Sequence, residues 1–335
     1  MIKSLLKEGF LANGADEIVY GSSTDWLGHL WRRLIVSPFE LLSSMVSLLV
    51  FFLLLILFMP VGYGRTLINN KASQQIWNDL IRQITRWYFY AAGIRLEIDG
   101  YHHLQALGQP VIFAANHPSY LDPLVLRIAL PDYAGCSVSA PIQSFPWPLS
   151  FWFSKVNALE VARTPEEHQR WPNLPKGNQV VEEAVRRLKH GYSILIFPEG
   201  HLERIRHPQS FRTGVVRMAL VSQRPIVPVT ICNSGWVFSP KNLLLRPGTI
   251  RIVFRQPLPL PNDATLIDRH EIINLLTNQL LCRIAQDLPA SYYTPGMILA
   301  CQEILSLHPV SRAASASQGK PKRVKKVNKK APSVG

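Results

Sequence analysis

A histidine and an aspartate stand five residues apart in the segment Asn116–Pro123, directly after an apolar run at Val111–Ala115 that predicts a strand. A neutral imidazole beside a carboxylate can take a proton from a hydroxyl, because the carboxylate orients the ring and stabilises the charge that forms. Pro118 suits the first turn of a helix, and a helix N-terminus favours the neutral form of a histidine beside it. His117 and Asp122 therefore predict a general base that activates an alcohol.

The same segment has a purely structural interpretation. His117 or Asn116 could close the first turn of the helix, with Asp122 left in solvent. A histidine and an aspartate at this spacing can occur by chance in a chain with ten histidines. The motif therefore needs support from other parts of the chain.

A second ionisable side chain follows another predicted strand. Tyr192–Phe197 is apolar without alternation, as buried parallel strands are, and it runs directly into Glu199. A carboxylate on the turn that leaves a parallel strand lies at the edge where ligands bind in open α/β sheets. If the two strands are neighbours, His117 and Glu199 face one crevice. Taken alone, Glu199 could equally be a surface turn residue.

Four motifs, in this order and spacing, resemble those of the glycerolipid acyltransferases, the family of bacterial lysophosphatidic acid acyltransferase. Asn-His-x-x-x-x-Asp at 116–122 and Phe-Pro-Glu-Gly at 197–200 are the two motifs already described. Between them, Asn157–Arg163 matches a family strand that ends in arginine, and Pro225–Val229 matches a later proline-bearing strand. The resemblance extends over about Leu96–Pro259 and favours the catalytic interpretation of the histidine.

The resemblance implies roles for individual residues. His117 would be the general base and Asp122 its orienting partner, while backbone N–H groups near the helix start would hold the oxyanion. Glu199 would contact the polar backbone of the acceptor, and Gly200 would leave room for it. Arg163 would pair with an acceptor phosphate through its planar fork of donors. Neither a metal nor a cofactor is implied, because the acyl thioester, from acyl-CoA or acyl carrier protein, is already activated.

One departure from the family pattern concerns the acceptor. Leu202 stands where the family has an arginine, so a cation that would bind phosphate is missing at this position. Arg204, Arg206 and Arg212 are the candidates to substitute for it. Asn116 is a further candidate for substrate binding. The resemblance implies 1-acylglycerol-3-phosphate as acceptor and phosphatidic acid as product, with other lysophospholipids or a lipid alcohol without phosphate as alternatives.

Two other classes of protein remain open. One is a catalytically silent membrane scaffold on the same fold. The other is a metal-dependent hydrolase built on His117, Asp122 and Glu199, although a third strong ligand at fitting spacing is missing from the sequence. The four cysteines contain no Cys-x-x-Cys pair and predict neither a disulfide framework nor a zinc site, which suits a reducing compartment.

An uncharged run at Leu41–Met59 is the strongest membrane signal. As a helix it would extend about 28 Å, close to the hydrocarbon thickness of a bilayer, and it lies too far along the chain for a signal peptide. A long buried helix is the alternative, but Leu48–Leu55 has no polar face. We predict a transmembrane or membrane-embedded helix over 39–62, ended by Pro60, Gly62 and Gly64. Similar numbers of basic residues flank its two ends, so crossing and re-entrant arrangements both stay open.

The next segment, 63–93, has the pattern of an amphipathic connecting helix, with apolar residues at helical spacing over Ala72–Ala92. This helix could pack against the catalytic domain. It could instead lie in the headgroup layer with Trp87, Tyr88 and Tyr90 at the interface.

The net charge of +14 comes partly from a basic C-terminal segment at Lys320–Lys330. We predict a disordered tail over 311–335 that attracts anionic lipid headgroups, with a merely solubilising tail as the alternative. Nucleic-acid binding is not expected, because no zinc-finger spacing or aromatic stacking motif accompanies the basic run. The predicted location is a membrane, with the catalytic domain facing the cytoplasm.

Alternating strand-like and helical segments predict an α/β fold with a mostly parallel, roughly seven-stranded sheet flanked by helices, as in glycerol-3-phosphate acyltransferases. The expected catalytic domain covers 94–310 and follows an N-terminal segment at 1–38. The expected strands are Ile94–Ile98, Val111–Ala115, Cys136–Ala140, Leu159–Val161, Ser193–Phe197, Ile226–Cys232 and Ile250–Phe254. The expected helices of this domain include Gln179–Lys189, Gly214–Ser222 and Ala264–Gln286.

Overall fold

The computed structural model describes residues 37–68, 73–105, 107–130, 135–200, 202, 210–238, 240, 244–261, 269–288 and 295–307. The predictions for the N-terminal segment up to residue 36 and for the basic tail at 311–335 lie outside these ranges.

Seven strands form one sheet, in the order β1-β7-β6-β2-β5-β3-β4. Five neighbouring pairs are parallel, and the β6–β7 pair is antiparallel. The predicted fold, a mostly parallel seven-stranded sheet, is therefore confirmed. The strands are β1 (Ile94–Asp99), β2 (Ile112–Ala115), β3 (Gly135–Ser139), β4 (Ala158–Glu160), β5 (Ser193–Ile196), β6 (Ile226–Cys232) and β7 (Gly248–Phe254).

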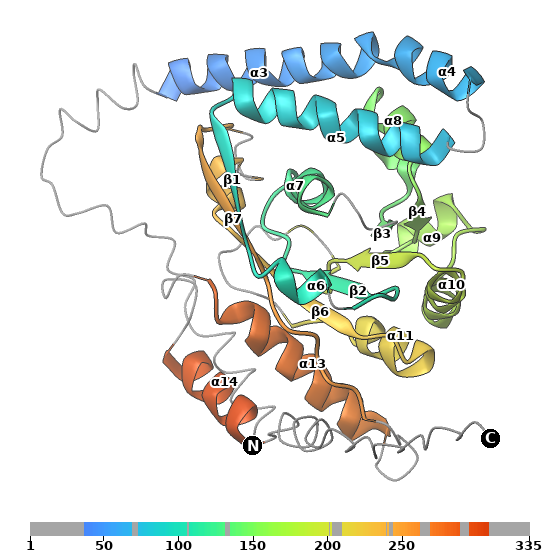
Figure 1. Ribbon diagram of the computed structural model, residues 1–335, viewed down its shortest axis with the longest axis vertical. Coiled ribbons are helices and arrows are strands. Elements are labelled where there is room, and N and C mark those ends of the chain that lie inside the picture. Colours follow the sequence, from blue (N-terminus) through green and yellow to red (C-terminus); the bar gives the residue numbers. More distant parts are fainter. Residues whose placement is uncertain are drawn as a thin grey trace, which may run out of the picture.

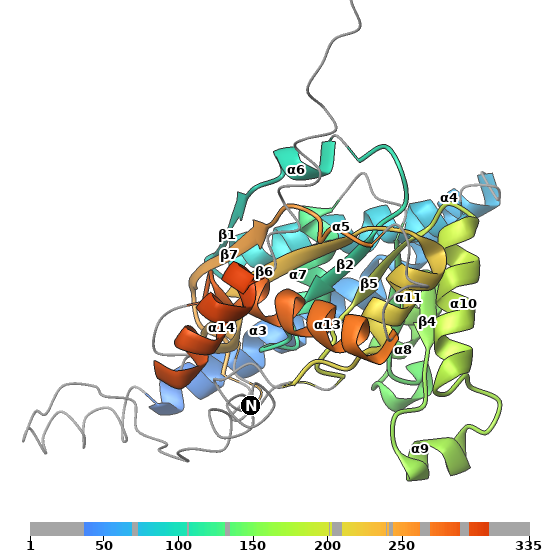
Figure 2. The same ribbon diagram turned by 90° about the horizontal axis from the view of Figure 1, so that it is seen from below.

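Helices cover both faces of this sheet (Figures 1 and 2). The longer ones are α3 (Ser37–Leu57), α4 (Met59–Ile68), α5 (Ser73–Ala91), α7 (Asp122–Ala129), α10 (Asn178–Lys189), α11 (Gly214–Ser222), α13 (Arg269–Ala285) and α14 (Pro295–Leu307). The shorter ones are α6 (His102–Gln105), α8 (Leu149–Lys155), α9 (Pro165–Arg170), α12 (Ser234–Val237) and the 3-10 helix η3 (Ile142–Ser144).

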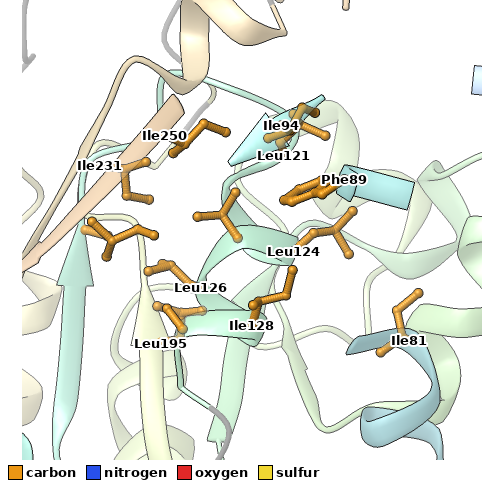
Figure 3. Close-up of a cluster of buried hydrophobic side chains, with 14 of the residues drawn as sticks. Ile81, Phe89, Ile94, Leu121, Leu124, Leu126, Ile128, Leu195, Ile231 and Ile250 are labelled. Atoms are coloured by element: carbon orange, nitrogen blue, oxygen red, sulfur yellow. The ribbon is translucent and has the colours of Figure 1, made fainter. Parts of the chain in front are cut away.

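The central strands are buried on both sides, which explains their unbroken apolar sequences. Every residue of β2 and β6 is buried. In β2, Ile112 and Ala114 pack with α10, α11 and α13, while Phe113 and Ala115 pack with α5 and α7, because successive side chains of a strand point to opposite faces. Figure 3 shows part of the hydrophobic cluster on the α5 and α7 side of the sheet, in which side chains of these helices meet those of the strands.

Helices α3 and α5 lie side by side across the α7 face of the domain (Figure 1). The ring of Phe51 in α3 contacts that of Tyr88 in α5 in a tilted arrangement, with 4.7 Å between the ring centroids. The apolar stretch Glu40–Ile68 is long enough to cross a membrane, yet one side of it is packed on the protein. The expected end of this helix at Pro60 is wrong. Helix α3 ends at Leu57, and after the single residue Phe58 the chain continues as α4, which contains Pro60. A proline is compatible with the first turn of a helix.

Helix α5 packs on the α/β domain through its apolar stripe. Trp77 and Ile84 are buried, and Tyr88, expected at a membrane interface, is only 3% exposed. Trp87 and Tyr90 point outward and are 48% and 90% exposed. The packed arrangement and an aromatic outer surface therefore occur on one helix.

The C-terminal part of the described chain differs from prediction in two ways. Helix α14 was not expected, and Cys282 of α13 forms a disulfide with Cys301 of α14, with 5.2 Å between their Cα atoms. The expectation of no disulfide is therefore wrong for this pair, since helix packing brings together two cysteines that share no sequence motif. Cys136 and Cys232 are buried free thiols, and burial raises the pKa of Cys232 to about 11.

Candidate active site

His117 and Asp122 face each other at the carboxyl end of β2. Nδ1 of the ring lies 2.9 Å from Oδ2 of the carboxylate. Asp122 is fully buried, whereas the histidine side chain is 17% exposed. When Nδ1–H donates to the carboxylate, Nε2 carries the lone pair. The pair thus has the geometry of a general base with an orienting acid.

The loop between β2 and α7 is folded around the Asp122 carboxylate. Oδ2 also accepts the backbone N–H of Ser119 at 2.7 Å. The helix begins at Asp122, with Pro123 in its first turn, so the expectation that Pro118 starts the helix is wrong. The loop before the helix is closed by hydrogen bonds to the carboxylate and to the Ser119 side chain instead of helical ones.

Ser234 completes the surroundings of this carboxylate. Its hydroxyl donates to Oδ1 of Asp122 at 2.6 Å, and both side chains are fully buried. Ser234 begins α12, directly after β6, which neighbours β2. The sequence did carry a signal for it, because a polar residue follows a third strand whose carboxyl end meets the same edge.

The turn after β5 contacts His117 from the other side. Phe197 stacks on the imidazole, with 4.0 Å between ring centroids and an interplanar angle of 16°. Glu199 is 3% exposed, and its Oε1 accepts the backbone N–H of His117 at 3.3 Å. Because β2 and β5 pair in parallel, the two strand ends meet as expected, and Glu199 holds the backbone that carries His117.

Asn116 joins the carboxyl ends of two strands. Its amide donates to the carbonyl of Ile231 at 2.9 Å and accepts the N–H of Ile231 at 2.7 Å, and the side chain is buried. Both ends of the amide are therefore occupied by β6. The expected contact of Asn116 with substrate remains a prediction.

The space beside Gly200 is filled by Arg212. Gly200 has φ of +77°, and a Cβ on it would collide with the Arg212 side chain. The backbone N–H of Arg212 donates to the carbonyl of Pro198 at 2.8 Å, and its side chain is exposed. The room expected at Gly200 is thus taken by a guanidinium group that lies against the turn bearing Glu199.

Arg163 follows β4 at the edge of the sheet. Its Nη2 donates to Oε1 of Glu167 at 2.9 Å, and its backbone N–H donates to the same carboxylate. The hydrogen bond from Arg163 lowers the pKa of Glu167 below its usual range. Leu202 is half-buried, and Arg204 and Arg206 lie outside the described residues. The structure therefore places one candidate cation, Arg212, against the Glu199–Gly200 turn. It pairs another, Arg163, with Glu167 of α9.

Within the ranges that the structure describes, no three histidine, cysteine, aspartate or glutamate side chains are grouped to hold a metal ion. Both oxygens of Asp122 are occupied by donors of the protein.

Comparison with known proteins gives a consistent result. Residues 95–232 match the Acyltransferase family model. A protein of Mycoplasma pneumoniae described as a probable 1-acyl-sn-glycerol-3-phosphate acyltransferase is 24% identical over 74% of this chain and 92% of its own length. Human 1-acyl-sn-glycerol-3-phosphate acyltransferase alpha is 26% identical over 54% of this chain and 62% of its own length.

One solved structure shows the shared fold. The crystal structure of the 1-acyl-sn-glycerophosphate (LPA) acyltransferase PlsC from Thermotoga maritima matches with a TM-score of 0.56 and 14% sequence identity. The match covers 73% of this chain and 97% of that one. The arrangement of strands and helices is therefore common to both.

Proposed function

This chain belongs to the acyltransferase family, and we propose that it transfers a fatty acyl group from a thioester to the free hydroxyl of a lysophospholipid. The acceptor we favour is 1-acylglycerol-3-phosphate, as in the descriptions of both relatives, with phosphatidic acid as the product. The donor in this proposal is acyl-CoA or acyl carrier protein, and the reaction uses no further cofactor.

The observation that carries the proposal is the contact between His117 and Asp122 beside Glu199. Nε2 of His117 accepts the proton of the acceptor hydroxyl, and the oxygen attacks the thioester carbonyl. A C–O bond forms while the carbonyl π electrons move to oxygen. When they return, the C–S bond breaks and the thiolate leaves. The thiolate then takes the proton that His117 held, which restores the neutral imidazole. No covalent acyl-enzyme is needed, because the thioester is already activated.

We propose that the acceptor phosphate binds Arg212, whose side chain lies against Gly200. Arg212 is exposed and lies against the Glu199–Gly200 turn. It can therefore replace the arginine that the family has at the position of Leu202. Arg163 is a second candidate at the same edge, although its guanidinium is paired with Glu167. The absence of an arginine at 202 also supports a lipid alcohol without phosphate as an alternative acceptor.

We propose that α3 and α4 lie along the membrane surface instead of crossing it. The outer side of this pair is apolar and exposed, including Leu42 at 61%, Leu49 at 59% and Leu53 at 54%. The inner side is engaged along its length: Ser44 exchanges hydrogen bonds with the backbone of Leu245, and Trp152 Nε1 donates to the carbonyl of Leu55. A crossing helix would draw these parts of the domain into hydrocarbon. An in-plane helix buries only its outer side.

In this arrangement the catalytic domain lies on one side of the bilayer, and we propose the cytoplasmic side, where acyl thioesters are available.

A transfer assay tests the activity. Membranes carrying the wild-type protein receive labelled acyl-CoA or acyl carrier protein together with a panel of lysolipids that includes an alcohol without phosphate. We expect transfer to 1-acylglycerol-3-phosphate that is lost in His117→Ala and kept in His190→Ala. His190 directly follows α10, and its ring Nδ1 lies 2.7 Å from the carbonyl oxygen of Arg186 in that helix. Equal transfer by wild type and His117→Ala would contradict the proposal.

Spin labels test the membrane arrangement. Labels introduced at Leu42, Leu53 and Leu67, one protein at a time, should report the same shallow depth in vesicles. A crossing helix would place the middle label deepest, which would overturn the in-plane arrangement. In flotation assays, Leu49→Asp with Leu53→Asp should release the protein, whereas Val221→Asp, an exposed apolar position on α11 of the other face, should not.

A further inference from the structure

The catalytic carboxylate has a partner that none of the four motifs contains. Ser234 donates to Oδ1 of Asp122 at 2.6 Å, and neither side chain is exposed. A hydroxyl that donates to an ionised carboxylate forms a short, charge-assisted hydrogen bond. Because the pair is fully buried, bulk water cannot substitute for the hydroxyl without a rearrangement of the packing.

This contact divides the two carboxylate oxygens between separate tasks. Oδ2 accepts from His117 Nδ1 and from the Ser119 backbone, while Oδ1 accepts from Ser234. Rotation of the carboxylate about its Cβ–Cγ bond would break all three contacts together. Ser234 therefore helps to fix the plane in which Oδ2 meets the imidazole.

The position of Ser234 is itself closely defined. A Cβ on Gly235 would lie 2.9 Å from the carbonyl oxygen of Pro118, so α12 rests directly on the loop that carries His117. At the end of α12, the carbonyl of Phe238 accepts the Ser119 hydroxyl at 2.9 Å. The segment from Ser234 to Phe238 is thus bonded to the catalytic loop at both ends.

We propose that Ser234 is a positioning residue for acyl transfer, whose hydroxyl orients Asp122 so that Oδ2 stays on Nδ1 of His117. The role rests on the proposed function for its effect on rate, but not for its effect on the imidazole. The proton of Ser234 remains on Ser234 throughout, and the proton of the acceptor goes to Nε2 of His117. Ser234 acts only through Asp122.

Kinetics of the purified full chain test this role. With lysophosphatidic acid and acyl-CoA, Ser234→Ala should lower kcat about 10- to 100-fold, the size of effect expected when a reacting group is misplaced. The KM values should stay within about twofold, because Ser234 does not touch substrate in this proposal. Ser234→Thr keeps the hydroxyl and should recover most of the loss. Gly235→Ala keeps Ser234 but pushes α12 from Pro118, and should resemble Ser234→Ala.

A matched control separates positioning from folding. Ser193 is also buried, and its hydroxyl accepts the N–H of Val111 at the opposite end of β2. Ser193→Ala should alter the unfolding temperature without altering kcat. Adding Ser234→Ala to Asp122→Asn should cause no further loss of kcat, because both changes act through the same carboxylate. A loss of kcat equal to that of Ser193→Ala, or additive with Asp122→Asn, would overturn the role.

A spectroscopic measurement does not require the correct substrate. In protein with ¹⁵N-labelled histidine, the Nδ1 proton of His117 should give a resonance that shifts or disappears in Ser234→Ala and persists in Ser193→Ala. An unchanged resonance in Ser234→Ala would overturn the proposal. Failure of the wild-type protein to acylate any lysolipid would instead count against the proposed function, and the resonance would still decide the role of Ser234.

Discussion

The two halves of the candidate site differ in how firmly the protein holds them. On the proton-transfer half, His117 and Asp122 are fixed by hydrogen bonds from the ends of β2, β5 and β6, and the carboxylate is fully buried. On the proposed phosphate half, Arg163 and Arg212 lie at the surface. In the proposed mechanism the proton-transfer groups are therefore held by the sheet, while the proposed acceptor contacts are exposed side chains that can change without disturbing the fold. Leu202, the departure from the family pattern, falls in this second half.

The largest effect should come from removing the charge of the buried carboxylate. Asp122→Asn should lower kcat about 10³-fold or more, because the amide cannot both orient Nδ1–H and stabilise the imidazolium that forms. Stability should fall by about 2 kcal/mol, because buried donors lose an acceptor. Steady-state kinetics and urea unfolding measure the two effects. Activity within tenfold of wild type would mean that the two halves are less different than the geometry indicates.

Arg212 tests the other half. Arg212→Ala should raise KM for 1-acylglycerol-3-phosphate about tenfold and leave kcat nearly unchanged, since a phosphate contact binds the ground state and the transition state alike. KM for a lipid alcohol without phosphate should not change. Arg217→Ala, an exposed arginine on α11, is the control for lost surface charge. A fall in kcat with unchanged KM would place Arg212 in the proton-transfer half instead.

Gly200 should show a smaller effect of the same kind. Gly200→Ala places a Cβ against the Arg212 side chain at a residue with φ of +77°. We expect a loss of about 1 kcal/mol of stability from the left-handed backbone and a rise in acceptor KM of a few fold as Arg212 moves. Adding Gly200→Ala to Arg212→Ala should not raise KM further. Additive KM effects would show that Gly200 contacts the acceptor directly, as the family resemblance implies.

The sequence was sufficient to predict the sheet and the residues that meet around His117. The seven strands and the meeting of His117, Asp122 and Glu199 follow from apolar runs that end in ionisable residues, because parallel strands bring their carboxyl ends to one edge. Those are local patterns joined by a general rule of topology.

The features that were missed depend on packing between distant segments. Ser234 and Asp122 are 112 positions apart, and the signal for Ser234, a polar residue after a third strand, is weak because serines often follow strands. The Cys282–Cys301 disulfide requires the packing of α14 on α13. Prolines misled prediction twice, at Pro60 and Pro118, because a proline fits the first turn of a helix, a loop or the end of a helix, and tertiary contacts select among these.

The smallest expected effect concerns the ion pair of Arg163 with Glu167. Glu167→Gln frees the guanidinium, and if Arg163 binds phosphate, KM for the phosphate-bearing acceptor should fall by about twofold, whereas Arg163→Ala should raise it. The pair contributes at most a few tenths of a kcal/mol to stability, because it lies at the surface, with the two side chains 33% and 18% exposed, and solvent screens it. Since Arg163 lowers the pKa of Glu167 from its usual value of 4.5, that contribution is present above pH 4.5 and is lost as the pH falls through the lowered pKa. Urea unfolding at pH 7 and at pH 3 measures it. An unchanged KM in both variants would confine Arg163 to holding α9, and leave Arg212 as the phosphate ligand among the described residues.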